Sequence, residues 1–106
     1  MYARIVTCTL PTEKREDFND TIRDQVLPIL KKQPGFVDLV GMVSEEQPDS
    51  TLGIALWDSK EDADHFYIHS EPLLDSLKPL LTHPPVVEHY NVQASIFQHA
   101  TAGKAA

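Results

Sequence analysis

The sequence predicts a single α+β domain in which two helices cover one face of a four-stranded antiparallel sheet. Three observations support this prediction. A chain of 106 residues has room for one core and two layers. Four runs rich in β-branched and apolar residues predict strands over residues 2–10, 36–43, 51–57 and 86–97. Apolar residues recur at helical spacing after the first and after the third of these runs, which gives the order β-α-β-β-α-β.

The first strand and the first helix are bounded by clear local signals. The strand at residues 2–10 is followed by Pro11, which cannot continue a sheet ladder. Thr12 is expected to cap the helix, and the acidic residues in its first turns favour the positive end of the helix dipole. Pro34-Gly35 ends the helix. Pro28 lies inside it, so we expect a kink there.

Local signals also mark the start of the second helix and a break within it. Ser59 and Asp62 resemble a capping box and predict the start of the second helix. The segment at 70–72 (SEP) predicts a break and a restart, because proline is tolerated only in a first helical turn. Residues 98–106 are small and polar, and we expect a flexible tail there, after a single domain at residues 1–97. The resulting split β-α-β arrangement is ferredoxin-like.

Composition narrows the range of partners and compartments. Nine Lys and Arg residues against sixteen Asp and Glu residues give a formal net charge of −7. Such a surface repels nucleic acid and anionic membranes, so we expect neither as a partner. No apolar run approaches the roughly 18 residues that span a bilayer. The single cysteine, Cys8, cannot form an internal disulfide, which favours a cytoplasmic protein.

The face of the predicted sheet that the helices leave uncovered is apolar. In the strand at 51–57, Leu52, Ile54 and Leu56 alternate with residues that are also apolar, and the strand at 36–43 shows the same pattern. A sheet covered on one side only normally alternates apolar and polar residues. Soluble monomers rarely expose an apolar patch of this size. We therefore predict a homodimer with two-fold symmetry, in which a second sheet covers this face.

Three stretches of the chain carry a family resemblance. They are Leu56-Trp57-Asp58-Ser59, then Ala63-x-x-Phe66-Tyr67-x-x-Ser70, and finally PPVVEHYNV at residues 84–92. With the element order, they resemble the antibiotic biosynthesis monooxygenase family, over about residues 2–95. That family belongs to the dimeric α/β-barrel superfamily. The resemblance implies that two chains pair into a dimeric α/β barrel. It also implies a cofactor-independent monooxygenase that uses dioxygen on a small aromatic, quinol-like substrate.

The resemblance also indicates whether the chain should bind heme. Heme-degrading members of the superfamily need an axial histidine in the second helical region and an asparagine in the first strand. The matching positions here are residues 75–78 (DSLK) and Thr7, so a heme site is not expected. Quinol monooxygenases of the family use a tryptophan near the third strand, which Trp57 matches. The alternative for Trp57 is a purely structural role at the helix–sheet junction.

Cofactor-free oxygenation needs a dry apolar pocket, a base near the substrate hydroxyl and a donor to the reduced oxygen species. In this architecture the pocket is expected between the helices and the sheet. The substrate-binding walls are expected to be apolar helix residues: Phe18, Ile22, Val26, Phe66 and Leu74. The candidate catalytic residues are Trp57, Tyr67 and His69, with His65 and His89 as alternatives.

Two other functions remain open at this point. His65 and His69 are spaced to bind a metal from one helix, which would suit a metal-dependent lyase or isomerase. The sequence offers no clear third ligand, so no metal site is expected. The other alternative is a non-catalytic dimer that binds a small molecule or serves a stress response. The partners expected are a second copy of the chain and a small aromatic molecule.

Overall fold

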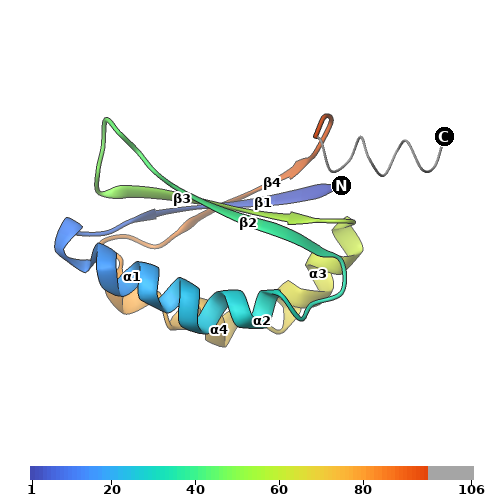
Figure 1. Ribbon diagram of the computed structural model, residues 1–106, viewed down its shortest axis with the longest axis horizontal. Helices are drawn as coiled ribbons and strands as arrows, with labels where there is room; N and C mark the ends of the chain where they lie inside the picture. The colour runs from blue at the N-terminus through green and yellow to red at the C-terminus, as the bar shows by residue number, and fades with distance from the viewer. Residues whose placement is uncertain (96–106) are drawn as a thin grey trace.

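The computed structural model describes residues 1–95. Its four strands form one antiparallel sheet in the order β2-β3-β1-β4. The strands are β1 (Tyr2–Thr9), β2 (Phe36–Val43), β3 (Ser50–Trp57) and β4 (Val86–Asn91). All helices lie on one face of this sheet (Figure 1). The predicted α+β topology is therefore confirmed.

The first helical region is irregular where proline interrupts it. It consists of η1 (Thr12–Lys14), α1 (Arg15–Thr21), the π-helical turn η2 (Ile22–Val26) and α2 (Leu27–Leu30). Pro28 lacks the N–H that would bond to the carbonyl of Asp24, and the wider π turn directly precedes it. The expected disturbance thus takes the form of a π turn. Thr12 does not act as the expected cap, because it opens a 3-10 turn with no side-chain cap.

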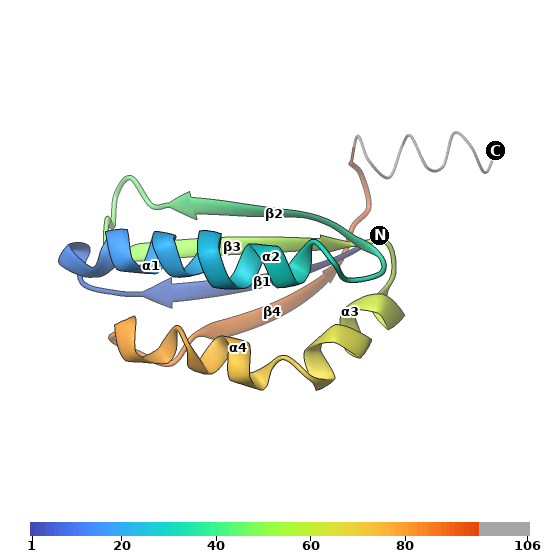
Figure 2. The same cartoon turned by 60° about the horizontal axis from the view of Figure 1, so that its bottom comes forward.

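The second helical region is broken as predicted. It consists of α3 (Lys60–Ile68), α4 (Glu71–Asp75) and the 3-10 turn η3 (Lys78–Leu80). Ser59 caps α3, since its Oγ accepts the Asp62 backbone N–H at 3.1 Å and donates to the Asp62 carboxylate at 3.0 Å. The two helical regions run side by side across the sheet (Figure 2). None of the helices in this described part of the chain is long and apolar enough to cross a membrane.

The fourth strand is shorter than expected. It ends at Asn91 rather than at residue 97, because Asn91 pairs with Tyr2 at the start of β1. One further backbone bond, from Val92 N to Met1 O at 3.0 Å, follows this last pair. Residues 92–95 form no strand. The predicted domain end at 97 and the tail at 98–106 lie outside the described residues.

A register irregularity in β2 decides which side chains reach the core. Phe36 pairs with Trp57 and Leu39 pairs with Ala55, with a shift in register between Phe36 and Asp38. Both Phe36 and Leu39 therefore pack against the core under the helices. Strict alternation along the strand would have placed these two side chains on opposite faces.

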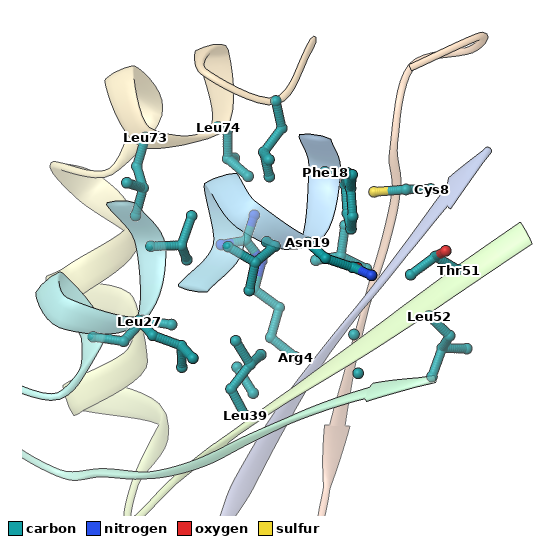
Figure 3. Close-up of a pocket in the computed structure, with 18 of the residues that line it drawn as sticks. Arg4, Cys8, Phe18, Asn19, Leu27, Leu39, Thr51, Leu52, Leu73 and Leu74 are labelled. Carbon is teal, nitrogen blue, oxygen red and sulfur yellow. The ribbon is translucent and has the colours of Figure 1, made fainter. Parts of the chain in front are cut away.

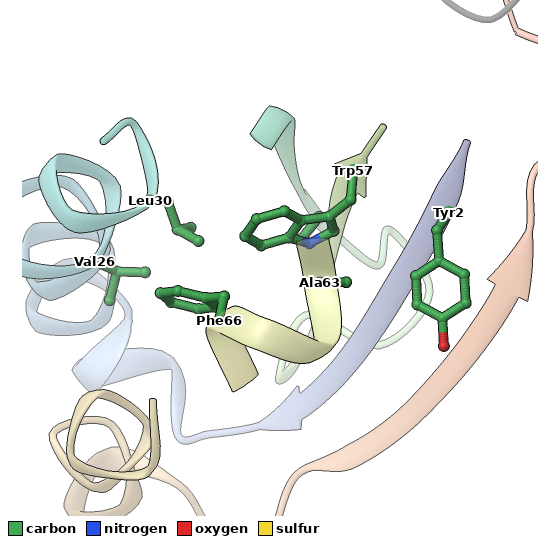
Figure 4. Packing of buried hydrophobic residues seen from close by; sticks show 7 residues of the cluster. Tyr2, Val26, Leu30, Trp57, Ala63 and Phe66 are labelled. Atoms are coloured by element: carbon green, nitrogen blue, oxygen red, sulfur yellow. The ribbon is translucent and has the colours of Figure 1, made fainter. Parts of the chain in front are cut away.

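The core lies between the helices and the sheet in two clusters. The larger is centred on Trp57, which reaches from β3 toward Leu30 and Phe66 (Figure 4). The smaller contains Cys8, Leu10, Phe18 and Leu77 at the other end of the sheet. Between these clusters the side chains leave a cavity, described below.

Gly35 is required where the chain turns from α2 into β2. Its φ is +79°, and a Cβ at this position would collide with the carboxylate of Asp62. We expect Gly35→Ala to lower the free energy of unfolding by about 2 kcal/mol, because the left-handed backbone is strained for alanine. Urea denaturation measures this loss. Gly41→Ala is the control, since its Cβ meets nothing within 4 Å. Equal losses in both variants would contradict the prediction.

Candidate functional site

A cavity of about 470 Å³ lies between the helices and the sheet. Its floor is formed by β1, β2 and β3, and its roof by α1, η2 and α2 together with α3 and α4 (Figure 3). Most of its lining is aliphatic or aromatic. Pockets that bind one small organic molecule have this size and this apolar character.

The five side chains predicted as substrate-binding walls all line this cavity. They are Phe18, Ile22, Val26, Phe66 and Leu74. The helical spacing that identified them places one stripe of each helix against the sheet. Leucines at positions 27, 30, 73 and 77 complete the apolar roof, and they were not among the predicted substrate-binding walls.

Of the three candidate catalytic residues, only Tyr67 lines the cavity. Trp57 is fully buried behind it, and its Nε1–H donates to Tyr67 Oη at 2.9 Å. The two rings pack edge to face, with centroids 5.7 Å apart. Because Tyr67 Oη accepts from the indole, its own proton remains available to a second partner. Trp57 thus fixes the direction of the Tyr67 hydroxyl.

Tyr67 is a hydrogen-bond donor at neutral pH. Burial raises the pKa of the Tyr67 phenol above its ordinary value of 10.0. The hydrogen bond from Trp57, the positive charge of Arg4 and a hydrogen bond from Arg4 lower the pKa, but burial is the larger effect. The neutral phenol therefore persists across the physiological range, so Tyr67 cannot act as the base there.

The three candidate histidines lie outside the cavity lining. His65 is exposed on α3 and His69 is exposed at its C-terminal cap, with ring centroids 6.0 Å apart. His69 borders a shallow surface depression instead, next to Ser70. His89 is exposed on β4, where it pairs with Arg4 in register and stacks on Tyr2 at 6.0 Å.

The positions of the His, Cys, Asp and Glu side chains decide whether the described residues could hold a metal ion. No group of three or more His, Cys, Asp or Glu side chains in residues 1–95 is placed to hold a metal ion. His65 and His69 therefore have no third ligand in that range. Cys8 lines the cavity, and burial raises the pKa of its thiol, so the neutral form dominates.

Arg4 is the main feature of the cavity that the sequence analysis missed. Its side chain extends from β1 toward the helices (Figure 3) and is only 9% exposed. Its guanidinium carbon lies 3.6 Å from the centre of the Tyr67 ring, a cation–π contact. The available signal was its alternation with Tyr2, Val6 and Cys8, which places a charge on the core-facing side of an apolar strand.

Comparison with known proteins adds a family match. The family model described as antibiotic biosynthesis monooxygenase matches residues 1–70. No curated protein sequence matches the chain.

Solved structures show the same fold at low sequence identity. A monooxygenase of Streptomyces coelicolor in complex with nanaomycin D is 18% identical, with a TM-score of 0.77 over 90% of this chain and 89% of that one. SnoaB, a cofactor-independent oxygenase from Streptomyces nogalater, is 15% identical, with a TM-score of 0.72 over 90% and 95%. A protein from Nitrosomonas europaea assigned to antibiotic biosynthesis monooxygenases is 20% identical, with a TM-score of 0.75 over 89% and 100%.

Proposed function

The chain belongs to the antibiotic biosynthesis monooxygenase family, and from this membership we propose that it is a cofactor-independent monooxygenase. The proposed substrate is a small, quinol-like aromatic, which reacts with dioxygen in the cavity between the helices and the sheet. Two structural neighbours are described as a monooxygenase bound to nanaomycin D and as a cofactor-independent oxygenase, which supports the proposed chemistry.

The observation that carries this proposal is the apolar cavity with one oriented phenol. A volume of about 470 Å³ suits a planar aromatic of two or three rings. Phe18 and Phe66 offer aromatic contacts, and a mostly apolar lining disfavours water beside a reduced oxygen species. The Tyr67 hydroxyl is the one candidate catalytic group that the fold brings to this space.

The proposed reaction needs no external electron donor. A ring C–H of the phenol or quinol becomes a carbonyl, one oxygen atom of dioxygen enters the product, and the other leaves as water. The two hydrogens of that water come from the ring carbon and from the substrate hydroxyl. The substrate is thus oxidised to a quinone and dioxygen is the oxidant.

We assign Tyr67 the role of hydrogen-bond donor to the oxygen that gains negative charge. A neutral phenol held by a hydrogen bond from Trp57 is preorganised for this purpose and undergoes little rearrangement during the reaction. Trp57 is then a positioning residue, because it acts on the substrate through Tyr67. Phe18, Ile22, Val26, Phe66 and Leu74 are proposed as the walls that hold the ring.

One observation favours the second candidate function, a binding protein without turnover. Among the lining residues there is no His, Asp or Glu that could remove a proton from the substrate. Oxygen uptake with a panel of hydroquinones, against heat-denatured protein, distinguishes the two functions. Enzyme-dependent uptake with quinone formation supports the monooxygenase. Tight binding of the same hydroquinones with no uptake would support the binding protein.

Tyr67→Phe is expected to lower kcat for oxygen uptake about 100-fold, because it removes the proposed donor while leaving the ring in place.

Since burial raises the pKa of Tyr67, wild-type activity that depends on this donor should stay level up to pH 9. It should be lost only as the pH rises through that raised pKa. Initial rates between pH 6 and 11 measure both effects.

Two further variants control for this result. Tyr90→Phe removes the same hydroxyl from the opposite face of the sheet, so uptake should remain. His69→Ala tests the imidazole that the sequence offered as a base, and its surface position leads us to expect a much smaller loss than in Tyr67→Phe. A larger loss in His69→Ala would show that the chemistry has been assigned to the wrong residue.

We further propose that the chain acts as a cytoplasmic homodimer. The sheet face opposite the helices carries Val40, Met42, Val86 and Tyr90, and the last two are 57% and 49% exposed. No helix of the described residues covers this face (Figure 1). A second sheet packed against it would remove this apolar surface from water. The free, buried thiol of Cys8 suits a reducing compartment.

A further inference from the structure

The cavity contains a positive charge that nothing in the described chain neutralises. Arg4 is 9% exposed, and its Nε is fully buried with no hydrogen-bond partner among residues 1–95. None of the ion pairs found in that part of the chain involves Arg4. A buried cation without a counter-charge is costly, and proteins rarely keep one that has no function.

The Tyr67 ring compensates for only part of this cost. A cation 3.6 Å from the ring centre is attracted by the face of the ring, and Arg4 also acts on the Tyr67 hydroxyl as a hydrogen-bond donor, but a neutral phenol supplies no counter-charge. A guanidinium offers further N–H groups in its plane besides Nε, and such groups bind oxygen anions.

The rest of the lining makes the cavity selective for negative charge. The lining residues include no Asp or Glu. The other lining arginine, Arg23, lies at the surface, and its charge is already balanced by Asp20 at 3.0 Å and Asp24 at 2.9 Å. Arg4 is therefore the uncompensated charge of the lining, although the chain as a whole carries −7.

From this arrangement we infer that the substrate of the proposed monooxygenase is an aromatic hydroxy acid, whose carboxylate pairs with Arg4. The inference rests on the proposed function in that it calls the bound molecule a substrate. The pairing with Arg4 itself concerns binding alone. A carboxylate is charged at all physiological pH values, whereas an unactivated phenol near its ordinary pKa of about 10 is neutral and would leave Arg4 unpaired. The ring then lies along the Tyr67 side of the cavity, within reach of its hydroxyl.

Anaerobic isothermal titration calorimetry tests this inference on the full-length protein. The probes are 1,4-dihydroxy-2-naphthoate and 1,4-dihydroxynaphthalene, which differ only in the carboxylate. We expect wild-type protein to bind the acid about 10- to 100-fold more tightly than the neutral quinol at pH 7. Raising the pH toward 10 tests the other source of negative charge: a gain in affinity for the neutral quinol alone would assign Arg4 to a phenolate and overturn the carboxylate.

Variants of Arg4 distinguish the effect of its charge from the effect of its shape on the preference for the acid. Arg4→Gln should remove the preference for the acid, and Arg4→Lys should keep part of it. Lys32→Gln makes the same change in net charge at an exposed position and should leave the preference unchanged. Arg4→Met should raise Tm, because it removes an unpaired buried charge. This last readout needs no ligand, and a lower Tm would contradict the description of Arg4 as uncompensated.

The outcomes distinguish this inference from the proposed function. Equal affinity of wild-type protein for the two probes, or a preference that survives in Arg4→Gln, would overturn the role of Arg4. No binding of the acid would overturn it as well. A carboxylate preference that depends on Arg4, without any oxygen uptake, would support the inference and contradict only the monooxygenase.

Discussion

Trp57→Ala is expected to lower the free energy of unfolding by about 3–5 kcal/mol. Trp57 is fully buried and packs against Phe36, Phe66 and Tyr67, with ring centroids 5.5, 5.4 and 5.7 Å away. It connects β2, β3 and α3, so its removal leaves a void that these three elements cannot close without moving. Urea denaturation followed by circular dichroism measures the loss.

Trp57→Phe is the matched variant, because it keeps an aromatic ring but removes the indole N–H. It should be clearly less destabilising than Trp57→Ala, yet kcat should fall since Tyr67 loses the hydrogen bond that orients it. If Trp57 had only a structural role, the loss of kcat in each variant would be in proportion to its loss of stability. A loss below about 1 kcal/mol in Trp57→Ala would contradict the central packing role.

Ile54→Asp is expected to convert the proposed homodimer into a monomer. Ile54 lies in the middle of the sheet face opposite the helices, between Ile5 on β1 and Val40 on β2. A carboxylate buried there between two sheets would cost on the order of 3 kcal/mol, which is more than 100-fold in Kd. Light scattering should then report a mass near 11.9 kDa instead of about twice that value.

Ile68→Asp is the control for this experiment. It makes the same substitution on α3, where Ile68 is 72% exposed on the helical side, so the dimer should persist. If Ile54→Asp does not fold, Met42→Asp tests the same face from the edge strand, at a side chain that is 45% exposed. A monomeric wild-type protein at micromolar concentration would contradict the predicted pairing.

The sequence identified side chains well where periodicity carries the information. Phe18, Ile22, Val26, Phe66 and Leu74 recur at helical spacing, and all five line the cavity. Helical spacing predicts burial from neighbouring residues alone, because it gathers the apolar side chains on one side of the helix, and that side packs against the sheet. The capping of α3 by Ser59 was visible for the same reason, since its partner is three residues away.

Residues defined by contacts between distant segments could not be placed in this way. The histidines were attractive candidates because imidazole titrates near neutral pH. Whether His69 faces the cavity depends on the rotation of α3 relative to the sheet, which no local pattern specifies. Arg4 was passed over because a charged residue in a strand is usually solvated, and only the helices packed above β1 bury it.

The amino-acid sequence by itself determined the order of the elements, the position of most of their ends within a few residues and the apolar character of both sheet faces. These properties follow from propensities and periodicities that act over a few residues. The tertiary structure alone decided the end of β4 at Asn91, the bulge that turns Phe36 inward and the contacts that join Arg4, Tyr67 and Trp57 in the candidate site. Each of these depends on which segments meet across the sheet and on the volume left between them, and that is a property of packing rather than of local sequence.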